Sequence, residues 1–308
     1  MLRVRFLGTG GSFPTPTRNT SSILFNREGE LLLFDCGEGT QRQMMRTKSG
    51  MGSLKSVFLT HLHADHFLGL PGVIQTLSFQ KRTEELTIFG TEGTEELMEH
   101  IMALGKFKPR FEVRVKELSP GDVIKRSGYK IRVIRTEHSI PSIGYVLEED
   151  ARPGKFDRER AIELGVPPGP LFSKLHHGES VIVNGREIRS EEVVGPPRPG
   201  RKVVYTGDTR PCRSVIEAAK GADLLIHDST MGAELADWAV NYRHSTAREA
   251  AEVAKEAGVA RLLLTHISPR YSNSAKRLLD DAKKVFENVT IAEDLMEIEV
   301  KYRDKKEH

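Results

Sequence analysis

Short runs of alternating hydrophobic and polar residues recur along most of the chain, and this alternation is typical of β-strands. The pattern predicts strands over residues 4–7, 22–25, 31–35, 56–60, 86–90, 111–117, 131–136, 202–206, 223–227, 261–265 and 297–302. Apolar residues spaced three and four positions apart predict helices over residues 39–46, 69–79, 94–103, 213–220, 246–257 and 274–286, with Ser245 as the N-cap of the helix at 246 and Gly258 just beyond its end. Strands interleaved with helices predict an α/β fold in which helices cover the sheets.

The segment 151–201 departs from this pattern. It holds seven of the chain's 15 prolines, together with nine Lys or Arg and seven Asp or Glu residues. Two interpretations are open. The segment is either a long surface loop or linker, or a small folded unit. The second is favoured by apolar residues that can pack together, namely Ile162, Leu164, Val166, Leu171, Phe172 and Leu175.

Composition narrows the class of protein. The 308 residues are 38% hydrophobic and 29% charged, which is typical of a folded globular protein. The apolar runs are far too short to span a bilayer, and the chain begins in a strand pattern without a signal segment. Cys36 and Cys212 lack CxxC spacing, which argues against a disulfide framework or thiolate zinc site and fits a reducing, cytoplasmic location. The net charge of +3 is too small to indicate nucleic-acid binding by itself.

The clearest chemical signal directly follows the predicted strand 56–60. Four potential metal ligands lie within six positions there: His61, His63, Asp65 and His66. Side chains alternate along an extended segment, so His61 and His63 project to one side, whereas Asp65 and His66 follow where the chain turns and can face a second ion. A single histidine at a strand end usually only satisfies a hydrogen bond, but this concentration of imidazole and carboxylate favours a site for zinc, manganese or iron.

Further candidate ligands follow other predicted strands. His138 comes after the strand at 131–136, Asp208 after 202–206, and His266 after 261–265. Loops that follow strands gather side chains around a site on a rigid scaffold. A carboxylate such as Asp208 can bridge two cations about 3.5–4 Å apart. The sequence therefore predicts a metal centre at the ends of several strands.

The HxHxDH motif, with the later His138, Asp208 and His266, resembles the metallo-β-lactamase superfamily. The resemblance implies an αββα sandwich, with residues 1–308 forming one domain and a dinuclear metal site at its edge. It implies that His61, His63 and His138 bind one ion, that Asp65, His66 and His266 bind the other, and that Asp208 bridges the two. It also implies that Asp35 supports the site without binding metal. From the sequence alone, Asp35 is interpreted as a buried carboxylate that caps the following helix, which is compatible with that role.

Three segments resemble one family of this superfamily, ribonuclease Z. They are residues 6–11 leading into 18–22, residues 205–211, and the His244-Ser245-Thr246-Ala247 sequence, which matches the family's HST loop. The resemblance implies that His244 assists departure of the leaving oxygen. The loop at residues 14–19 lacks the lysine of the family's Pro-x-Lys-x-Arg-Asn pattern, but it keeps Arg18, which is expected to contact the terminal nucleotides.

Residues 155–175 resemble the flexible arm, or exosite, of short-form ribonuclease Z. The resemblance implies that residues 151–201 are an inserted arm that grips the body of a tRNA, acting from the partner subunit of a homodimer. Phosphate contacts, which position RNA without reading its bases, are expected from Arg152, Lys155, Arg158, Arg160 and Lys174.

The resemblance implies a zinc-dependent endoribonuclease that removes the 3′ trailer from precursor tRNA and leaves a tRNA 3′-hydroxyl and a 5′-phosphorylated trailer. Two Zn²⁺ per subunit are expected, with Mn²⁺ or another divalent ion as a substitute, and Asp65 is expected to orient the attacking hydroxide and accept its proton. Two alternatives stay open: a small-molecule phosphodiesterase or arylsulfatase-like hydrolase of the same superfamily, and a non-catalytic RNA-binding protein with a structural metal site. A structural zinc site is usually closed and tetrahedral, which suits these seven candidate ligands poorly.

Overall fold

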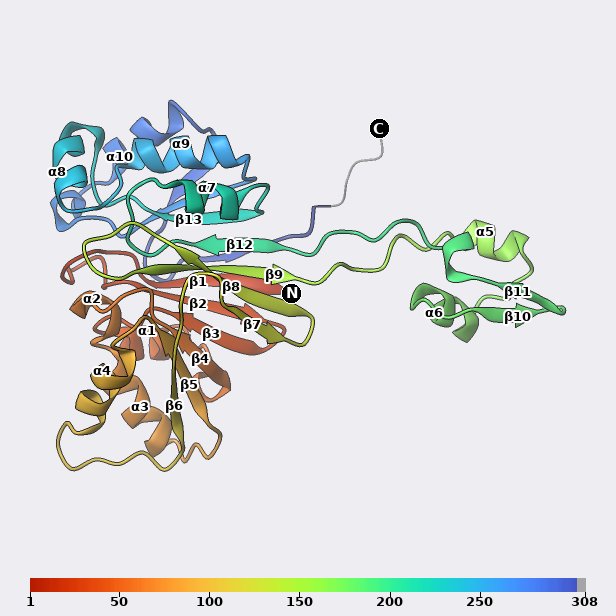
Figure 1. The fold of residues 1–308 in the computed structure, drawn as a ribbon, viewed down its shortest axis with the longest axis horizontal. Helices are drawn as coiled ribbons and strands as arrows, with labels where there is room; N and C mark the ends of the chain where they lie inside the picture. Colours follow the sequence, from red (N-terminus) through yellow and green to blue (C-terminus); the bar gives the residue numbers. More distant parts are fainter. Residues whose placement is uncertain (304–308) are drawn as a thin grey trace.

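The computed structural model describes residues 1–303. The main body contains two seven-stranded sheets that pack face to face (Figure 1). Across the first sheet the strands are β16 (Glu297–Glu299), β1 (Leu2–Gly8), β2 (Ser22–Arg27), β3 (Glu30–Phe34), β4 (Leu54–Phe58), β5 (Leu86–Gly90) and β6 (Val113–Glu117). Across the second they are β15 (Val289–Ile291), β14 (Leu262–Thr265), β13 (Leu224–Asp228), β12 (Lys202–Tyr205), β9 (Ile143–Glu149), β8 (Tyr129–Arg135) and β7 (Val123–Arg126).

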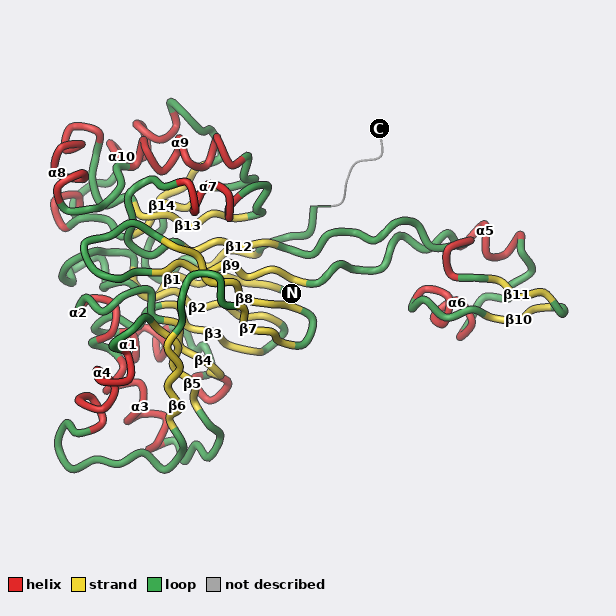
Figure 2. Tube along the Cα trace, viewed as in Figure 1, coloured by secondary structure: helices red, strands yellow, loops and turns green. Residues whose placement is uncertain are grey.

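Separate hydrophobic cores hold these layers together. Aromatic side chains fill the space between the sheets, where Phe34 stacks on Phe58 with ring centroids 4.9 Å apart and Tyr145 and Tyr205 meet Phe34 edge-on. A second core joins the first sheet to α1 (Thr40–Arg46), α3 (Leu70–Phe79) and α4 (Thr94–Met102). A third joins the second sheet to α7 (Arg213–Ala219), α9 (Ala247–Ala257) and α10 (Lys276–Lys283). The helices therefore cover the outer faces of both sheets, as Figure 2 shows.

The remaining helices are short. Two lie near the ends of strands in the main body, α2 (Ala64–Phe67) and α8 (Ala236–Asn241). The 3₁₀-helices are η1 (Met51–Ser53), η2 (Ser190–Glu192), η3 (Ala233–Leu235) and η4 (Pro269–Tyr271).

Most predicted elements are present, with differences at their ends. The strand expected over 297–302 pairs only over Glu297–Glu299, and the one expected over 111–117 begins at Val113. The hydrophobic pattern missed β7, β9 and β15, as well as two short strands in the segment 151–201, β10 (Val181–Val183) and β11 (Arg186–Ile188). Of these, β9 lacks alternation because its first five residues are all buried, so that both of its faces are covered, whereas β7 is a short, exposed edge strand.

The predicted cap of α9 is wrong by one residue. Thr246 is the N-cap, because its side chain accepts a hydrogen bond from Glu249 N while the Glu249 carboxylate accepts from Thr246 N. This reciprocal arrangement is a capping box, which Thr-x-x-Glu spacing forms. Ser245 instead donates its hydroxyl to Thr209 O at 2.6 Å. Gly258 ends the helix with a left-handed φ of 61°, as expected.

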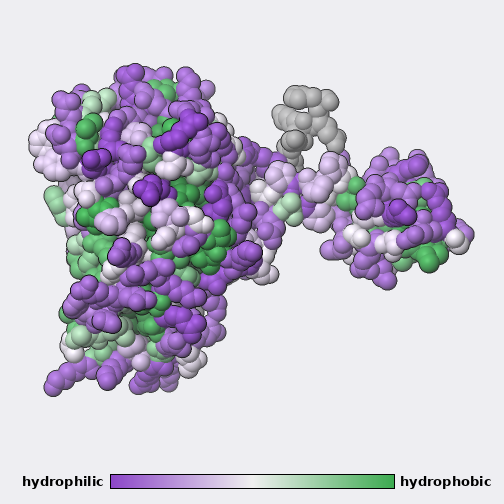
Figure 3. Space-filling view, in the orientation of Figure 1, coloured by the Kyte–Doolittle hydropathy of each residue, from purple (hydrophilic) through white to green (hydrophobic). Residues whose placement is uncertain are grey.

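Residues 151–201 fold as a small unit that stands away from the main body on two extended segments (Figure 1). The unit contains α5 (Arg158–Glu163), α6 (Pro170–His176) and a hairpin of β10 (Val181–Val183) and β11 (Arg186–Ile188). Its own core buries Ala161, Val166, Leu175, Val181, Ile188 and Val193. The linker interpretation is therefore wrong, although Ile162 is 48% exposed and does not join this core. The unit's surface is largely hydrophilic, with a hydrophobic patch along its outer edge in Figure 3.

A buried ion pair closes the base of this arm. Arg201, just before β12, donates to both oxygens of Glu149 at the end of β9, at 2.7 and 2.8 Å. Arg27 of β2 donates to the same carboxylate at 2.9 Å. The ring of Tyr302 contacts two guanidinium groups, with its centre 3.4 Å from the Arg152 Cζ and 4.1 Å from the Arg201 Cζ. The C-terminal segment and both strands that lead into the arm are thus joined at one point.

This arrangement predicts an acid-sensitive contribution to stability. Burial would raise the pKa of Glu149, but the hydrogen bonds and charges of Arg201 and Arg27 outweigh burial and lower that pKa from 4.5 to about 2. A depressed carboxyl pKa stabilises the fold above the unfolded-state pKa, and the contribution is lost as the pH falls from about 4.5 towards 2. We expect Glu149→Gln to lower the free energy of unfolding at pH 7 by about 2–3 kcal/mol.

Urea unfolding at several pH values between 7 and 3 measures this effect. The difference between wild type and Glu149→Gln should stay constant down to about pH 5 and shrink below about pH 4.5. Glu179→Gln, at an exposed position in the arm, is the matched control and should change little. A difference between wild type and Glu149→Gln that is absent at pH 7, or constant with pH, would contradict the interpretation.

Candidate metal centre and catalytic site

The predicted ligands converge at one edge of the sandwich because each follows a strand that ends there. His61 and His63 follow β4, His138 follows β8, and Asp208 follows β12. His266 follows β14, which runs parallel to β13 and β12, so the carboxyl ends of these three strands share an edge. The short helix α2 adds Asp65 and His66 from the same loop as His61.

The first group consists of His61, His63, His138 and Asp208, each with one ligand atom within 4.8 Å of the others. His63 Nδ1 lies 3.1 Å from both His61 Nε2 and His138 Nε2. Two nitrogens bound tetrahedrally to one zinc at about 2.0–2.1 Å lie about 3.3 Å apart. These spacings therefore suit a shared cation.

The second group consists of Asp65, His66 and His266, and Asp208 lies between the two groups. Asp208 Oδ2 is 3.2 Å from His266 Nε2, 3.5 Å from His66 Nε2 and 3.6 Å from His61 Nε2. Asp65 Oδ2 is 3.3 Å from His266 Nε2. The carboxylate of Asp208 thus faces both sets of imidazoles, the position that a bridging ligand occupies.

Two buried atoms indicate that this cluster suits cations. Among residues 1–303, neither His66 Nε2 nor Asp208 Oδ1 has a hydrogen-bond partner, although both atoms are buried. Leaving such atoms unpaired is costly, and a cation beside them removes that cost. Burial would raise the pKa of Asp208, but the imidazoles of His266, His66 and His61 keep it well below its usual range. The ionised carboxylate and imidazole nitrogens fit divalent metal ions.

Each of four histidines is oriented through its other ring nitrogen. A metal-ligating histidine normally makes such a bond, which sets its tautomer and ring angle. The partners of the Nδ1 atoms are Thr60 Oγ1 for His61, Asp35 Oδ2 for His66, the Arg243 carbonyl for His138 and Thr230 Oγ1 for His266, at 3.0, 2.8, 3.0 and 2.7 Å respectively.

Asp35 is buried beneath the cluster and touches both sheets. Its Oδ1 accepts from Thr60 N at 2.8 Å, and its Oδ2 accepts from Tyr205 OH at 2.7 Å as well as facing His66. The helix-cap interpretation of Asp35 is wrong, because Gly39 is the N-cap of α1. The contacts of Asp35 are those of a residue that orients His66.

His244 lies beside the ligand cluster. Its Nδ1 is 2.9 Å from Asp228 Oδ2 and 3.8 Å from Asp208 Oδ2, and its side chain is 14% exposed. Burial would lower the pKa of His244, but Asp228 outweighs burial and raises it to about 9. The imidazole is thus held through Nδ1 at a partly exposed position beside the cluster.

The sequence analysis missed Asp228 and Thr230. Asp228 Oδ1 accepts from Thr230 Oγ1 at 2.6 Å, and that hydroxyl lies 2.7 Å from His266 Nδ1. Asp228 therefore contacts His244 directly and His266 through one hydroxyl. The sequence held a signal for Asp228, because this residue lies at the end of β13 and the predicted ligands also lie just after strands. The strand predicted over 223–227, however, stopped one residue before Asp228.

A substitution at Gly11 tests how closely the N-terminal loop packs against His266. A Cβ at Gly11 would lie 2.4 Å from His266 Cε1, while the next residue, Ser12, donates its backbone N–H to Asp65 Oδ2 at 2.7 Å. We expect Gly11→Ala to weaken divalent-ion affinity by about 10- to 100-fold, because the methyl group displaces His266. Calorimetric metal titration measures this. Gly52→Ala, where a Cβ meets nothing within 4 Å, is the control, and equal affinity in the two variants would contradict the prediction.

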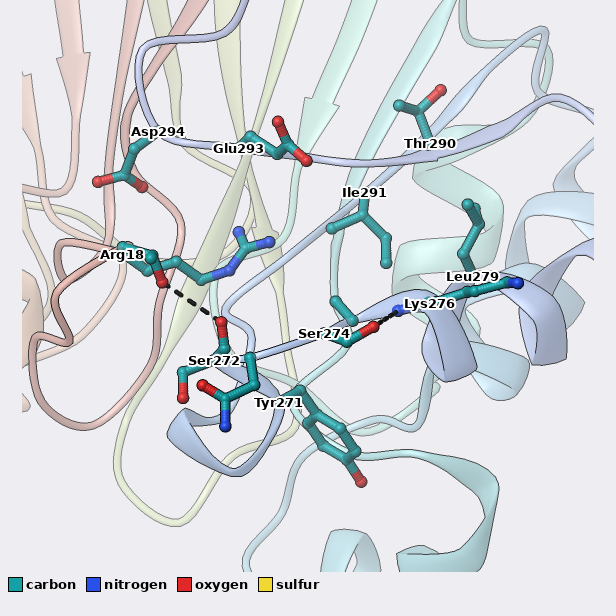
Figure 4. Close-up of a pocket in the computed structure, with 13 residues that line it drawn as sticks. Arg18, Tyr271, Ser272, Ser274, Lys276, Leu279, Thr290, Ile291, Glu293 and Asp294 are labelled. Carbon is teal, nitrogen blue, oxygen red and sulfur yellow. Dashed lines mark hydrogen bonds between the residues drawn. The ribbon is translucent and has the colours of Figure 1, made fainter.

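Arg18 lies on the wall of a cavity of about 630 Å³ next to η4, the turn that follows His266. Figure 4 shows its guanidinium group extending toward Ile291 and Glu293. Its Nη1 donates to Thr9 Oγ1 and to Ala292 O, each at 2.6 Å. Arg18 is therefore partly engaged in holding the N-terminal loop, and contact with substrate stays a prediction.

The basic arm residues fall into two sets. Lys155, Arg158, Arg160 and Lys174 are exposed, with Arg160 paired to Glu163 at 3.0 Å. Arg152 instead lies at the base of the arm against Tyr302, away from α5 and α6. The surface of the arm therefore presents four of the five predicted cations.

Comparisons with known proteins agree with this fold. A family model for a beta-lactamase superfamily domain matches residues 190–267, and one for the anti-Pycsar protein Apyc1 matches residues 2–152. Ribonuclease Z of Methanosarcina acetivorans is 59% identical over 98% of this chain and 99% of its own length. The chain belongs to the ribonuclease Z family. Ribonuclease Z of Archaeoglobus fulgidus is 50% identical over the same shares of both chains.

Solved structures confirm the predicted αββα metallo-β-lactamase sandwich. The short form of human tRNase Z matches with a TM-score of 0.70 and 28% identity, over 97% of this chain and 99% of its own. The metallo-beta-lactamase fold protein YhfI of Bacillus subtilis also has a TM-score of 0.70, at 22% identity over 96% and 98% of the two chains, and shows the fold alone. Within residues 1–303 the structure contains no helix that is long and apolar enough to span a membrane.

Proposed function

We propose that this ribonuclease Z family protein is a metal-dependent endoribonuclease that removes the 3′ trailer from precursor tRNA, leaving a tRNA 3′-hydroxyl and a 5′-phosphorylated trailer. The observation that carries the proposal is the cluster of His and Asp side chains with His244 held beside it by Asp228. Full-length relatives named ribonuclease Z support the substrate.

Two divalent ions, with Zn²⁺ as the first candidate and Mn²⁺ as a substitute, are proposed as the cofactors. His61, His63 and His138 would hold one ion, Asp65, His66 and His266 the other, and Asp208 both. When bound, such ions attract a phosphate oxygen and make water acidic enough to supply hydroxide at neutral pH.

Asp65 is the proposed proton acceptor. Burial would raise the pKa of Asp65, but His66 and His266 keep it well below its usual range, so its carboxylate is ionised. Ser12 N donates to Asp65 Oδ2 at 2.7 Å and fixes the orientation of the carboxylate. The ionised carboxylate can therefore align the attacking hydroxide, and we propose that it accepts the proton of that hydroxide as attack proceeds.

His244 is the proposed proton donor to the leaving 3′ oxygen. Its Nδ1 bonds to Asp228, which directs Nε2 away from Asp228 and toward substrate. In the catalytic triad of proteases, a buried carboxylate fixes an imidazole in the same way. Donation of a proton, or of a hydrogen bond, to the 3′ oxygen lowers the charge that develops as the bond breaks.

The arm is proposed to act on the site of a partner subunit in a homodimer. β9 and β12 are antiparallel, with Lys202 opposite Glu148 at the arm's base and Tyr205 opposite Tyr145 toward the metal centre. The arm therefore leaves one end of this strand pair, while Asp208 lies beyond the other end, and Figure 1 shows the arm pointing away from the body. An RNA gripped by the arm lies far from the same chain's site.

The predicted cytoplasmic location stays a prediction.

Cleavage of a 3′-extended precursor tRNA, compared with an unstructured RNA of equal length and with and without chelator, tests the function. We expect one chelator-sensitive cut at the end of the acceptor stem and little cleavage of the unstructured RNA. Equal cleavage of both RNAs, or no cleavage beside rapid hydrolysis of a small phosphodiester, would remove the proposal and leave the fold family standing.

An armless variant tests the role of the arm. Arg152 and Arg198 form an antiparallel bridge, with N···O distances of 2.8 and 2.9 Å, so residues 153–197 can be replaced by a two-residue Asn-Gly turn. We expect the kcat/KM for precursor tRNA to fall at least about a hundredfold, as expected when several phosphate contacts are lost, and small-diester hydrolysis to stay within about twofold.

Mixing two inactive proteins tests action across the dimer. Armless protein lacks the RNA grip, and full-length Asp65→Asn lacks the proton acceptor. If the arm of one subunit serves the site of the other, the mixture forms heterodimers that recover cleavage, whereas no recovery despite mixed dimers would show that the arm serves its own chain.

A further inference from the structure

Two aromatic rings, one on α8 and one at its C-cap, lie exposed without a role in the proposed chemistry. Trp238, the only tryptophan in the chain, is 44% exposed, and Tyr242 is 57% exposed. Their ring centroids are 5.6 Å apart and their planes differ by 36°. Together they make a wide aromatic surface, which we call the α8 platform.

The α8 platform is attached directly to the loop that carries His244. Tyr242 N donates to Trp238 O at 2.9 Å, and His244 N donates to Ala239 O at 2.8 Å, so the chain turns tightly between the aromatic pair and the histidine. Arg243, with a left-handed φ of 59°, presents its carbonyl to His138 Nδ1 at 3.0 Å. The platform is therefore held next to the ligand cluster.

Cationic groups border the α8 platform. The guanidinium group of Arg270 lies 4.9 Å from the centre of the Trp238 ring. Arg270 belongs to η4, four residues after His266, so Trp238, on the helix that precedes His244, also contacts the turn that follows His266. Both Arg270 and Arg243 are exposed. Exposed aromatic rings flanked by arginines are the surface on which unpaired nucleobases stack, because every base has a π-face and carries a phosphate.

We propose that Trp238 and Tyr242 stack the unpaired base of the last tRNA nucleotide, the one on the 5′ side of the cleaved bond. The assignment to this nucleotide rests on the proposed function, in which His244 meets the 3′ oxygen of that same nucleotide. Stacking holds the base and so aligns its 3′ oxygen with the histidine. Trp238 and Tyr242 are thus specificity-determining residues for substrates with an unpaired 3′ end.

The kinetics of protein variants test the platform. We expect Trp238→Ala to lower the kcat/KM for precursor tRNA by about tenfold or more, chiefly through KM, as is usual for loss of base–aromatic stacking. Small-diester hydrolysis should be unchanged. Trp238→Phe should retain most of the activity because it keeps a ring, and Val240→Ala, at an exposed non-aromatic position on α8, should match wild type.

The occupant is identified by removing its base. Wild type should cleave a precursor with an abasic residue at the last tRNA position about tenfold less efficiently than the intact precursor. Trp238→Ala should cleave these two precursors equally well. If the abasic residue lowered the cleavage efficiency of Trp238→Ala as much as that of wild type, this base would not stack on Trp238. The effects of removing two partners that contact each other do not add.

Binding of product provides a readout without turnover. Because Trp238 is the only tryptophan, quenching of its fluorescence reports on stacking directly. Metal-loaded protein should be quenched by a tRNA that ends at the cleaved position and not by the same tRNA with an abasic end. Equal quenching by both tRNAs, or a Trp238→Ala variant as active as wild type on precursor tRNA, would overturn the proposed role of the α8 platform. A wild-type protein that does not cleave precursor tRNA would instead overturn the proposed function.

Discussion

Asp65→Asn is expected to reduce the kcat for precursor tRNA by about 10³–10⁵-fold, because it removes a proton acceptor and weakens a proposed ligand set in one substitution. The amide keeps the size of the side chain but cannot take up a proton. It also presents a neutral group to Ser12 N and His266, which both face the carboxylate in the native protein at 2.7 and 3.3 Å. Single-turnover cleavage of labelled precursor, with elemental analysis of the bound metal, measures both effects.

The control for Asp65→Asn is Asp280→Asn, at an exposed position on α10. This control should keep wild-type activity and wild-type metal content. An Asp65→Asn enzyme that retains more than about a tenth of the wild-type kcat would exclude Asp65 as the proton acceptor, whatever its metal content.

His244→Ala is expected to lower the kcat for precursor tRNA by about 10²–10⁴-fold with little change in KM, which is the range for general acid catalysis. The same variant should be affected much less on a small diester whose leaving group is a stable anion, since such a group departs without a proton. That contrast separates a proton donor from a residue that merely supports the fold. Similar losses on both substrates would contradict the assigned role.

Two further variants define the control and the partner of His244. His100→Ala, at an exposed position on α4, should behave as wild type. Asp228→Asn should lower kcat in the same direction as His244→Ala, because the hydrogen bond that orients the imidazole at 2.9 Å is weakened. In the double variant the losses should not multiply, since the two side chains act as one unit.

The predicted ligand set could be obtained from the sequence because its signals are local. His61, His63, Asp65 and His66 lie within six positions, and His138, Asp208 and His266 each follow a recognisable strand. Strand patterns depend on nearest neighbours along the chain, so they survive without tertiary information. The structure then brings these seven side chains together, and their roles as ligands stay predictions.

The residues that the sequence did not reveal are those whose roles depend on distant partners. Asp228 contacts His244 and Thr230 from the end of β13, and its position at a strand end, which was its signal in the sequence, does not show which side chains it meets. Trp238 has a role only because α8 ends beside the His244 loop. The joint at the base of the arm brings Glu149, Arg201 and Tyr302 together from three separate segments.

The sequence by itself determined the alternation of strands and helices, the types of donor atom available to a metal, and the presence of a proline-rich basic insertion. Those properties follow from periodicity and residue chemistry, which are short-range. The packing of two sheets decided the rest: which strand ends meet, why Asp208 lies between two groups of imidazoles, and why the arm leaves from the end of β9 and β12 opposite the metal centre. Such juxtapositions join residues that are far apart in the sequence, such as Asp65 and His266, which are 201 positions apart, and they arise only when the hydrophobic faces of both sheets are buried against each other.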